Sequence, residues 1–117
     1  TALVSASTAG IGHAIAVQLL EEGANVIING RSESGVAQAV ATLQERFGAG
    51  RVFPLVADMS VAGSEAIAAA QYPAVDILVN NMGTYALSDF FVTSDEEWQR
   101  MFEVNVWSGV PLYARYA

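Results

Sequence analysis

Four short apolar segments alternate with stretches of helical periodicity along the 117 residues of the chain. Strands are expected at residues 2–5, 25–29, 51–56 and 75–80, and helices at residues 12–22, 33–47, 64–71 and from residue 94 onward. Parallel strands need a crossover connection, usually a helix, so this alternation indicates βαβ units. The sequence therefore predicts an α/β fold in which helices cover both faces of a doubly wound parallel sheet, giving three layers, α/β/α.

Prolines and a capping motif mark boundaries in these elements. Pro54 has no N–H for a ladder hydrogen bond, so the third strand is expected at a sheet edge. Ser94 and Glu97 form the pattern of a capping box at the start of the last helix. Pro111 removes a helical donor and clashes with the preceding turn, which predicts a kink or an end between residues 107 and 111.

The last helix carries an apolar stripe that is expected to be buried, as core or as an interface. The stripe consists of Trp98, Met101, Phe102, Asn105, Gly109 and Leu112. Asn105 stands out in it, because a buried amide is unfavourable unless it is hydrogen-bonded.

Composition excludes several classes of function. The net charge is −7, and the five arginines are scattered with no lysine beside them, which argues against a nucleic-acid partner. No cysteine is present, so disulfides and thiolate chemistry are excluded, and a reducing, cytoplasmic location is expected. His13 is the only histidine, so no metal site is expected. No apolar run approaches the ~20 residues that cross a bilayer, and no membrane partner is expected.

The first βα turn, Val4 to Ala16, has the chemistry of a phosphate-binding site. Gly10 and Gly12 lie where a helix begins, and a dinucleotide pyrophosphate needs close backbone approach and free amides there. The alternative is that these glycines only allow close packing of strand and helix. Ala6 occupies the first small position, and an alanine with φ > 0 there would cost about 1–2 kcal/mol.

The turn, Ser5-Ala6-x-x-x-Gly10-Ile11-Gly12, resembles the Thr-Gly-x-x-x-Gly-Ile-Gly turn of the short-chain dehydrogenase/reductase family, with Ser5-Ala6 in place of Thr-Gly. Asp58 and Met59 match the family segment that contacts the adenine amino group, although Asp58 also suits an ordinary Asx turn. Asn80-Asn81-Met82-Gly83 resembles the Asn-Asn-Ala-Gly segment that lines the cofactor site. The resemblance implies a Rossmann-like fold, with the later strands absent from these residues.

The end of the second strand, Asn29-Gly30-Arg31-Ser32, is where such a fold reads the 2′ position of the cofactor. No carboxylate is available there for a ribose hydroxyl. The guanidinium of Arg31, assisted by the Ser32 hydroxyl, can bind a 2′-phosphate, which predicts a preference for NADP(H) over NAD(H). The alternative is a solvated surface arginine. The expected cofactor site comprises Ser5, Ser7, Thr8, Gly10, Ile11, Gly12, Asn29, Arg31, Ser32, Asp58, Met59, Asn81, Met82 and Gly83.

The resemblance also implies an activity and a missing catalyst. Family members transfer hydride between the nicotinamide and a ketone or secondary alcohol. The expected substrate is a small molecule, and the default expectation for the enzyme is a reductase similar to the 3-oxoacyl carrier-protein type. Asn105 matches the family's catalytic asparagine. The Tyr-x-x-x-Lys pair cannot be formed in a chain without lysine, and the family's catalytic serine is expected beyond Ala117. Residues 1–117 are therefore expected to be one NAD(P)-binding domain, part of a longer domain, and inactive alone.

The expected assembly is a homo-oligomer, and two alternative functions remain open. The resemblance implies a homodimer or homotetramer formed through the helix that contains Asn105 and the next one. A non-catalytic nucleotide-binding or scaffold protein is one alternative function. An epimerase built on an extended form of the same fold is another.

Overall fold

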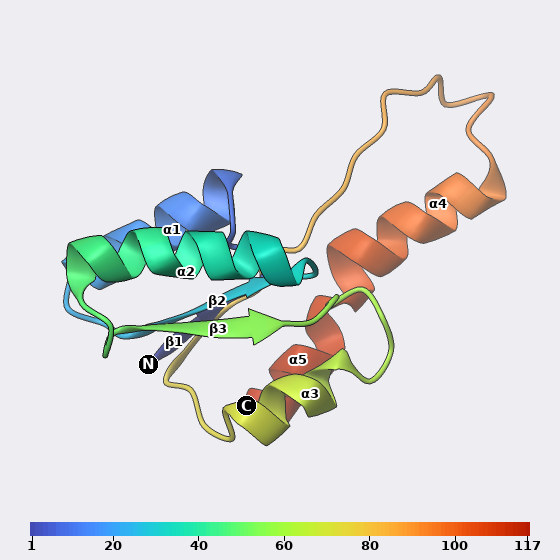
Figure 1. Cartoon of the computed structure of the whole chain (residues 1–117). Coiled ribbons are helices and arrows are strands. Elements are labelled where there is room, and N and C mark those ends of the chain that lie inside the picture. The colour runs from blue at the N-terminus through green and yellow to red at the C-terminus, as the bar shows by residue number, and fades with distance from the viewer.

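A computed structural model describes residues 1–117 as a parallel sheet with helices on both faces (Figure 1). The strands are β1 (Ala2–Val4), β2 (Val26–Gly30), β3 (Val52–Val56) and β4 (Ile77–Val79). The helices are α1 (Gly10–Glu21), α2 (Glu33–Phe47), α3 (Ser64–Gln71), α4 (Asp95–Phe102) and α5 (Gly109–Tyr116), and a π-helical turn, η1 (Glu103–Trp107), joins the last two. The predicted α/β class is confirmed.

The four strands lie in the order β3-β2-β1-β4, and every pair is parallel. Leu3 of β1 stands beside Ile27 of β2 on one side and Leu78 of β4 on the other. The chain therefore leaves β1 toward β2 and β3, and later crosses to the opposite side of β1 to form β4. Pro54 lies in the edge strand β3, as its missing N–H predicts.

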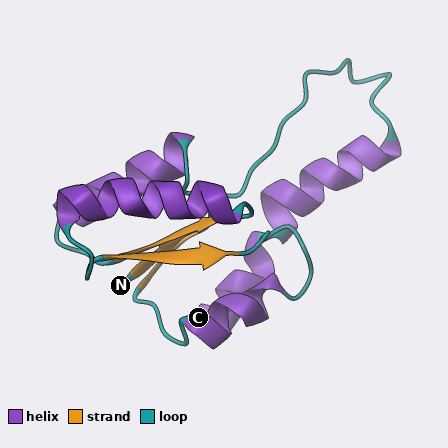
Figure 2. Ribbon diagram, in the orientation of Figure 1, coloured by secondary structure: helices purple, strands orange, loops and turns teal.

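Alternate strand residues face two separate layers of helices, which confirms the three-layer architecture (Figure 2). One apolar cluster joins Val4 and Ile28 to side chains of α1 and α2. The other joins Leu3 and Ile27 to Ala68 of α3 and to α5. The strands are thus buried on both faces, as their nearly continuous apolar sequence requires.

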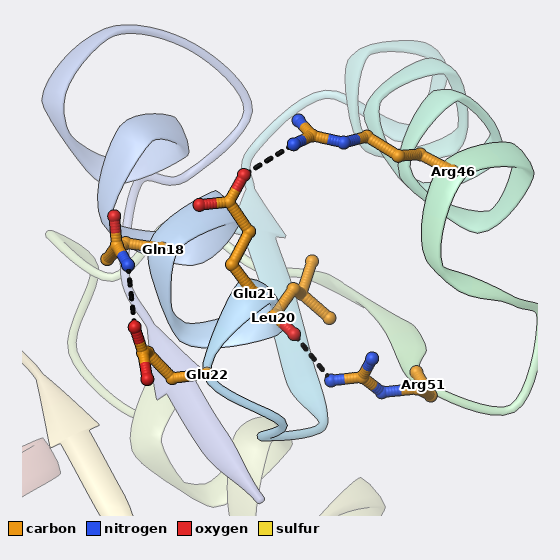
Figure 3. Close-up of polar contacts among 6 residues, drawn as sticks. All are labelled: Gln18, Leu20, Glu21, Glu22, Arg46 and Arg51. Carbon is orange, nitrogen blue, oxygen red and sulfur yellow. Dashed lines mark hydrogen bonds and ion pairs between the residues drawn. The ribbon is translucent and has the colours of Figure 1, made fainter.

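The C-terminal end of α1 is closed by backbone and by an arginine side chain. Gly23 has φ +97 and donates to Leu20, while the amide of Ala24 donates to Leu19, the paired bonds of a Schellman motif. Arg51 then donates to the carbonyl oxygen of Leu20 at 2.7 Å (Figure 3). It also donates to the carbonyl oxygen of Ala24 at 2.7 Å. The first βα unit is thereby joined to the start of β3.

The segment from α4 to α5 begins and breaks where the sequence predicts. Ser94 accepts from the amide of Glu97, and the Glu97 carboxylate accepts from the amide of Ser94, so the capping box is present. The helical path widens into η1, where the amide of Ser108 bonds five residues back to Glu103. Pro111 follows in the first turn of α5, consistent with the predicted break.

The expected burial of the apolar stripe is wrong for α4. No residue of α4 is buried, and Trp98 and Phe102 are each about half exposed. Helix α4 and the loop before it lie away from the sheet (Figure 1), and Asn105 is exposed as well. Only Leu112, which packs beneath the sheet, meets the expectation in full. The physical reason is that no other element of these residues covers that face.

No helix is both long and apolar enough to span a bilayer.

Candidate cofactor site

A cleft of about 360 Å³ lies at the carboxyl ends of all four strands. It is lined by Ala6, Thr8, Ala9, Asn29, Gly30, Arg31, Ala57, Asp58, Met59, Ser60, Met82, Gly83, Thr84, Arg100 and Val104. In open parallel sheets ligands bind outside these ends, at the point where the strand order reverses. Here that point lies between β1 and β4, beside the glycine turn.

Ala6 holds the turn after β1 in a left-handed conformation, with φ +50. Its amide donates to the Asn29 side-chain oxygen at 3.0 Å, and its carbonyl accepts from the Asn81 side-chain amide at 3.1 Å. Alanine rarely adopts this conformation, because its Cβ approaches the carbonyl oxygen. The two asparagines therefore stabilise a turn that the residue at its centre disfavours.

Gly12 and Gly10 serve different parts of the turn. A Cβ on Gly12 would lie 2.4 Å from the Ala6 carbonyl oxygen and 2.5 Å from the Asn81 side-chain nitrogen. Gly12 therefore permits close packing between helix and turn, as the alternative interpretation held for both glycines. Gly10 has φ +62, and a Cβ on it would meet no atom within 4 Å outside its chain neighbours and its own helix, so its surroundings are open.

The N-terminus of α1 fits a bound anion. Its N-cap residue, Ala9, provides no side-chain cap, and the amides of the first helical turn have no acceptor within the helix. Ile11, in this turn, is 75% exposed although it is apolar. Uncapped amides, an open glycine and an exposed apolar side chain at the end of a strand together suit the pyrophosphate of a dinucleotide.

Ser5 and Ser7 are buried and hold the turn through their hydroxyls. The Ser7 hydroxyl donates to Val4 at 2.7 Å and accepts from the Asn29 amide at 2.9 Å. The Ser5 hydroxyl accepts from the Asn81 amide at 2.8 Å. Both side chains thus connect β1 to its two neighbouring strands, and neither lines the cleft.

Asn29 is almost fully buried at the end of β2. Its side-chain amide donates to the carbonyl oxygens of Leu55 and Ala57 at 3.1 and 3.0 Å, and its oxygen accepts from Ala6. A buried amide with these partners satisfies its hydrogen-bonding groups within the protein. Asn29 therefore sets the relative positions of the glycine turn, β2 and the end of β3.

Arg31 and Ser32 follow β2 at the edge of the cleft. Arg31 is exposed and lines the cleft, while Ser32 caps α2 by accepting from Gly35 at 3.2 Å. The Ser32 hydroxyl also pairs with that of Ser34 at 3.0 Å. The structure thus brings a permanently charged guanidinium and a helix N-terminus to the same corner, both of which attract phosphate.

Asp58 follows β3 with one carboxylate oxygen already bonded. This oxygen accepts from the Ser60 hydroxyl at 2.6 Å and from the Ser60 amide at 3.0 Å, so the Asx turn is present. The Ser60 hydroxyl, then its amide, and more weakly the charges of Arg31 and Arg100 hold the pKa of Asp58 below its usual 3.8. Asp58 is therefore an ionised acceptor on the cleft wall, with Met59 buried beside it.

The side chain of Asn105 joins η1 to the loop after β4 by hydrogen bonds. Its oxygen accepts from the Thr84 amide at 3.1 Å, and its side-chain nitrogen donates to the carbonyls of Thr84 and Met101 at 2.9 and 2.8 Å. It lies outside the cleft and lines an adjoining cavity of about 390 Å³, which shares Met82 with the cleft and includes Tyr113. Asn105 thus positions the segment Met82–Thr84 that separates the two spaces.

Arg100 and Val104 line the cleft, and sequence reasoning missed them. They are four residues apart and so share one face of the helix that begins with α4. The sequence held no signal for them, since consecutive helix positions such as Val104 and Asn105 do not face the same side. Nothing in the sequence placed Arg100 opposite Asp58.

Comparison with known proteins gives one consistent result. The family model for short chain dehydrogenases matches residues 1–115. The oxidoreductase YvaG of Bacillus subtilis is 47% identical over 99% of this chain and 44% of its own length. The D-beta-hydroxybutyrate dehydrogenase of Rhizobium meliloti is 34% identical over 91% of this chain and 43% of its own length.

A solved structure agrees with these relatives. The L-sorbose reductase of Gluconobacter frateurii, complexed with NADPH and L-sorbose, superposes with a TM-score of 0.89 at 30% identity, covering 98% of this chain and 45% of the reductase. The chain thus spans less than half the length of these relatives. The family match, the parallel sheet and the cleft beside the glycine turn lead to one conclusion: the chain belongs to the short-chain dehydrogenase/reductase family of oxidoreductases.

Proposed function

We propose that residues 1–117 form the NADP(H)-binding part of an oxidoreductase that interconverts a small carbonyl compound and its alcohol. One observation carries this proposal: the cleft at the strand ends combines an uncapped helix N-terminus, at α1, with the free guanidinium of Arg31 at the end of β2. Bound NADP(H) supplies or accepts the hydride. The chain's own residues bind and orient the dinucleotide.

The preference for NADP(H) depends on Arg31. Its planar, permanently charged fork can bind a 2′-phosphate, and no carboxylate at the end of β2 is available for a free ribose hydroxyl. The NADPH complex of L-sorbose reductase, a structural neighbour, supports this choice of cofactor. Ser32 contributes through the N-terminus of α2, which it caps.

Equilibrium titration of the intact protein with NADPH and NADH tests the preference. We expect tighter binding of NADPH, and a reversal of the order in Arg31→Asp, because the new carboxylate repels the phosphate and accepts from the ribose hydroxyl. Arg115→Asp is the matched control, since it makes the same charge change on α5, outside the cleft. Equal affinities for both cofactors in all three proteins would refute the assignment.

Asn105 is proposed as a positioning residue for catalysis. Asn105 is hydrogen-bonded to Thr84, which lines the cleft, so a shift of this loop would move the cleft wall. In the intact protein, Asn105→Ala should lower kcat by a larger factor than KM changes, with a small loss of stability because Asn105 is exposed. An unchanged kcat would contradict this role.

Turnover is proposed to require residues other than these 117. The family's reaction uses a tyrosine as acid/base, and a nearby cation must lower its pKa from about 10 for work at neutral pH. The chain has no lysine to form the Tyr-x-x-x-Lys pair. The 117-residue chain alone should therefore not oxidise NADPH with any carbonyl compound, and measurable turnover by it would overturn this part.

The substrate class is tested on the intact protein with a small panel. L-Sorbose, D-β-hydroxybutyrate and an acetoacetyl thioester represent sugar, hydroxy acid and 3-oxoacyl substrates, the first two taken from the names of similar proteins. The readout is the absorbance of the reduced nicotinamide. If the protein turned over none of these substrates and no other ketone, a non-catalytic nucleotide-binding function would be favoured.

A homodimer or homotetramer is proposed from the exposed face of α4 and the preceding loop. Phe90 and Trp98 pack edge to face, with 5.8 Å between their ring centroids, and both are more than half exposed. Phe102, one turn after Trp98, is more than half exposed as well. Such a contiguous apolar surface marks an interaction site. Light scattering with size-exclusion chromatography of the intact protein tests this, and a monomer would contradict it.

A further inference from the structure

We propose that Arg100 binds the adenine base, by donating to the ring nitrogen N1 while Asp58 accepts from the adjacent amino group. This inference rests on the proposed function, since it concerns the same dinucleotide. It adds Arg100, on α4, to Asp58 as a second residue that hydrogen-bonds the adenine base.

The placement of Arg100 is the first step. Arg100 lines the cleft, and its guanidinium makes no hydrogen bond or ion pair with the rest of the chain. Asp58 lies on the same cleft, close enough for the charge of Arg100 to act on its carboxylate. The two groups are therefore a hydrogen-bond donor and an acceptor that line one cleft and form no ion pair with each other.

The chemistry of the pair selects the ligand group. A guanidinium only donates hydrogen bonds, and an ionised carboxylate only accepts them. Ser60 occupies one oxygen of Asp58, which leaves the other oxygen for a ligand. The edge of adenine farthest from the ribose presents an amino donor beside the acceptor N1, so it complements this pair. Met59 and Val104, also in the cleft lining, supply apolar contact for the ring.

A phosphate suits Arg31 better than Arg100 for an electrostatic reason. The charges of both arginines act on the ionised Asp58, that of Arg31 more strongly, so repulsion by this carboxylate does not distinguish them. Arg31 also adjoins the N-terminus of α2, which favours an anion, whereas Arg100 lies in the last turn of α4. The cleft is thus divided into a phosphate corner at Arg31 and a base-reading wall at Asp58 and Arg100.

The experiment measures dissociation constants of the intact protein for three probes: NADPH, NADH and the 1,N6-etheno derivative of NADPH. The etheno bridge blocks both the amino group and N1. Arg100→Met should weaken NADPH and NADH by the same factor, about 10-fold, because both carry adenine. It should weaken the etheno derivative by a clearly smaller factor, since N1 of that base is substituted and no longer accepts from Arg100.

Two variants complete the design. Arg115→Met, the same substitution outside the cleft, should change none of the three constants. Arg100→Gln keeps an N–H donor without the charge, and should retain more affinity for NADPH than Arg100→Met. Thermal unfolding of each variant verifies folding, which α4's exposure should preserve.

Three results would overturn the inference. Weakening of NADPH alone would assign Arg100 to the 2′-phosphate, and equal weakening of all three probes would assign it a general attraction for anions. No weakening of any probe would leave Arg100 without a role in binding. Failure of the proposed function is distinguishable, because the unsubstituted protein would then bind neither NADPH nor NADH.

Discussion

The side-chain amide of Asn81 donates to the carbonyl oxygen of Ala6 at 3.1 Å, and this bond joins the loop after β4 to the turn after β1. The backbone amide of Asn81 donates to the Ser5 hydroxyl at 2.8 Å. These two bonds thus hold β1 and β4 together at the edge of the sheet where the cleft opens. The geometry of the glycine turn therefore depends on a residue 75 positions away in the sequence.

Ala6→Gly should stabilise the protein. Ala6 has φ +50, a conformation that glycine adopts without the clash of a Cβ, so we expect the free energy of unfolding to rise by about 1 kcal/mol. Urea denaturation measures it. Ala49→Gly is the control, because Ala49 lies in an exposed turn without positive φ and should lose about 0.5–1 kcal/mol. Equal effects of the two substitutions would contradict the strain at Ala6.

Alanine at the two helix glycines should separate packing from backbone strain. Gly12→Ala brings a Cβ against the backbone oxygen of Ala6, which cannot easily move, so we expect a loss of about 3 kcal/mol and of cofactor binding. Gly10→Ala meets no neighbour and should lose only about 1 kcal/mol from its φ of +62. Urea denaturation and NADPH titration report the two effects. A larger loss at Gly10 than at Gly12 would reverse the assignment.

Arg46 and Arg51, the two arginines near the end of α1, should contribute very different amounts to the free energy of unfolding (Figure 3). Arg51→Met removes donors to the carbonyls of Leu20 and Ala24, and should lower the free energy of unfolding by about 2 kcal/mol. Arg46→Met breaks an exposed ion pair with Glu21, and should lower it by less than about 0.5 kcal/mol. Thermal unfolding compares them, and similar losses would argue against a capping role for Arg51.

Local patterns predicted the elements because the signals that define them are local. Helix α2 begins after the Ser32 cap and ends before Gly48, both visible in the sequence, and its predicted bounds agree at both ends. Gly23 likewise indicates a helix end after α1, where the structure has a Schellman motif. The burial of α4 could not be predicted, since periodicity shows that one face is apolar but does not show what covers that face.

The site was partly predictable for a similar reason. Residues that follow a parallel strand must meet at one edge of the sheet, so Arg31, Asp58 and Met82 were expected together, and they line the same cleft. A serine after a strand looks the same whether its hydroxyl faces a ligand or holds the backbone, as Ser7 does. Arg100 enters the cleft only through the path of α4, which no local pattern determines.

Tyr72 and Tyr116 should make the protein less stable at alkaline pH. Tyr116 donates to the carbonyl of Tyr72 at 2.7 Å, Tyr72 donates to that of Pro54 at 2.6 Å, and burial raises the pKa of both phenols above the usual 10.0. The unfolded chain then loses these protons at a lower pH than the folded protein does. The free energy of unfolding is therefore unaffected by them below about pH 10 and falls as the pH rises further.

Urea denaturation at a series of alkaline pH values measures this dependence. The double variant with Tyr72→Phe and Tyr116→Phe should be less stable at neutral pH, by about 1 kcal/mol for each lost hydrogen bond, yet should lose stability less steeply above about pH 10. Tyr85→Phe is the control for the loss of a phenol, because Tyr85 is 82% exposed and its hydroxyl bonds to no other residue, so its removal should leave the stability at neutral pH as it is. If the double variant kept the original slope, other groups would be responsible for the alkaline loss.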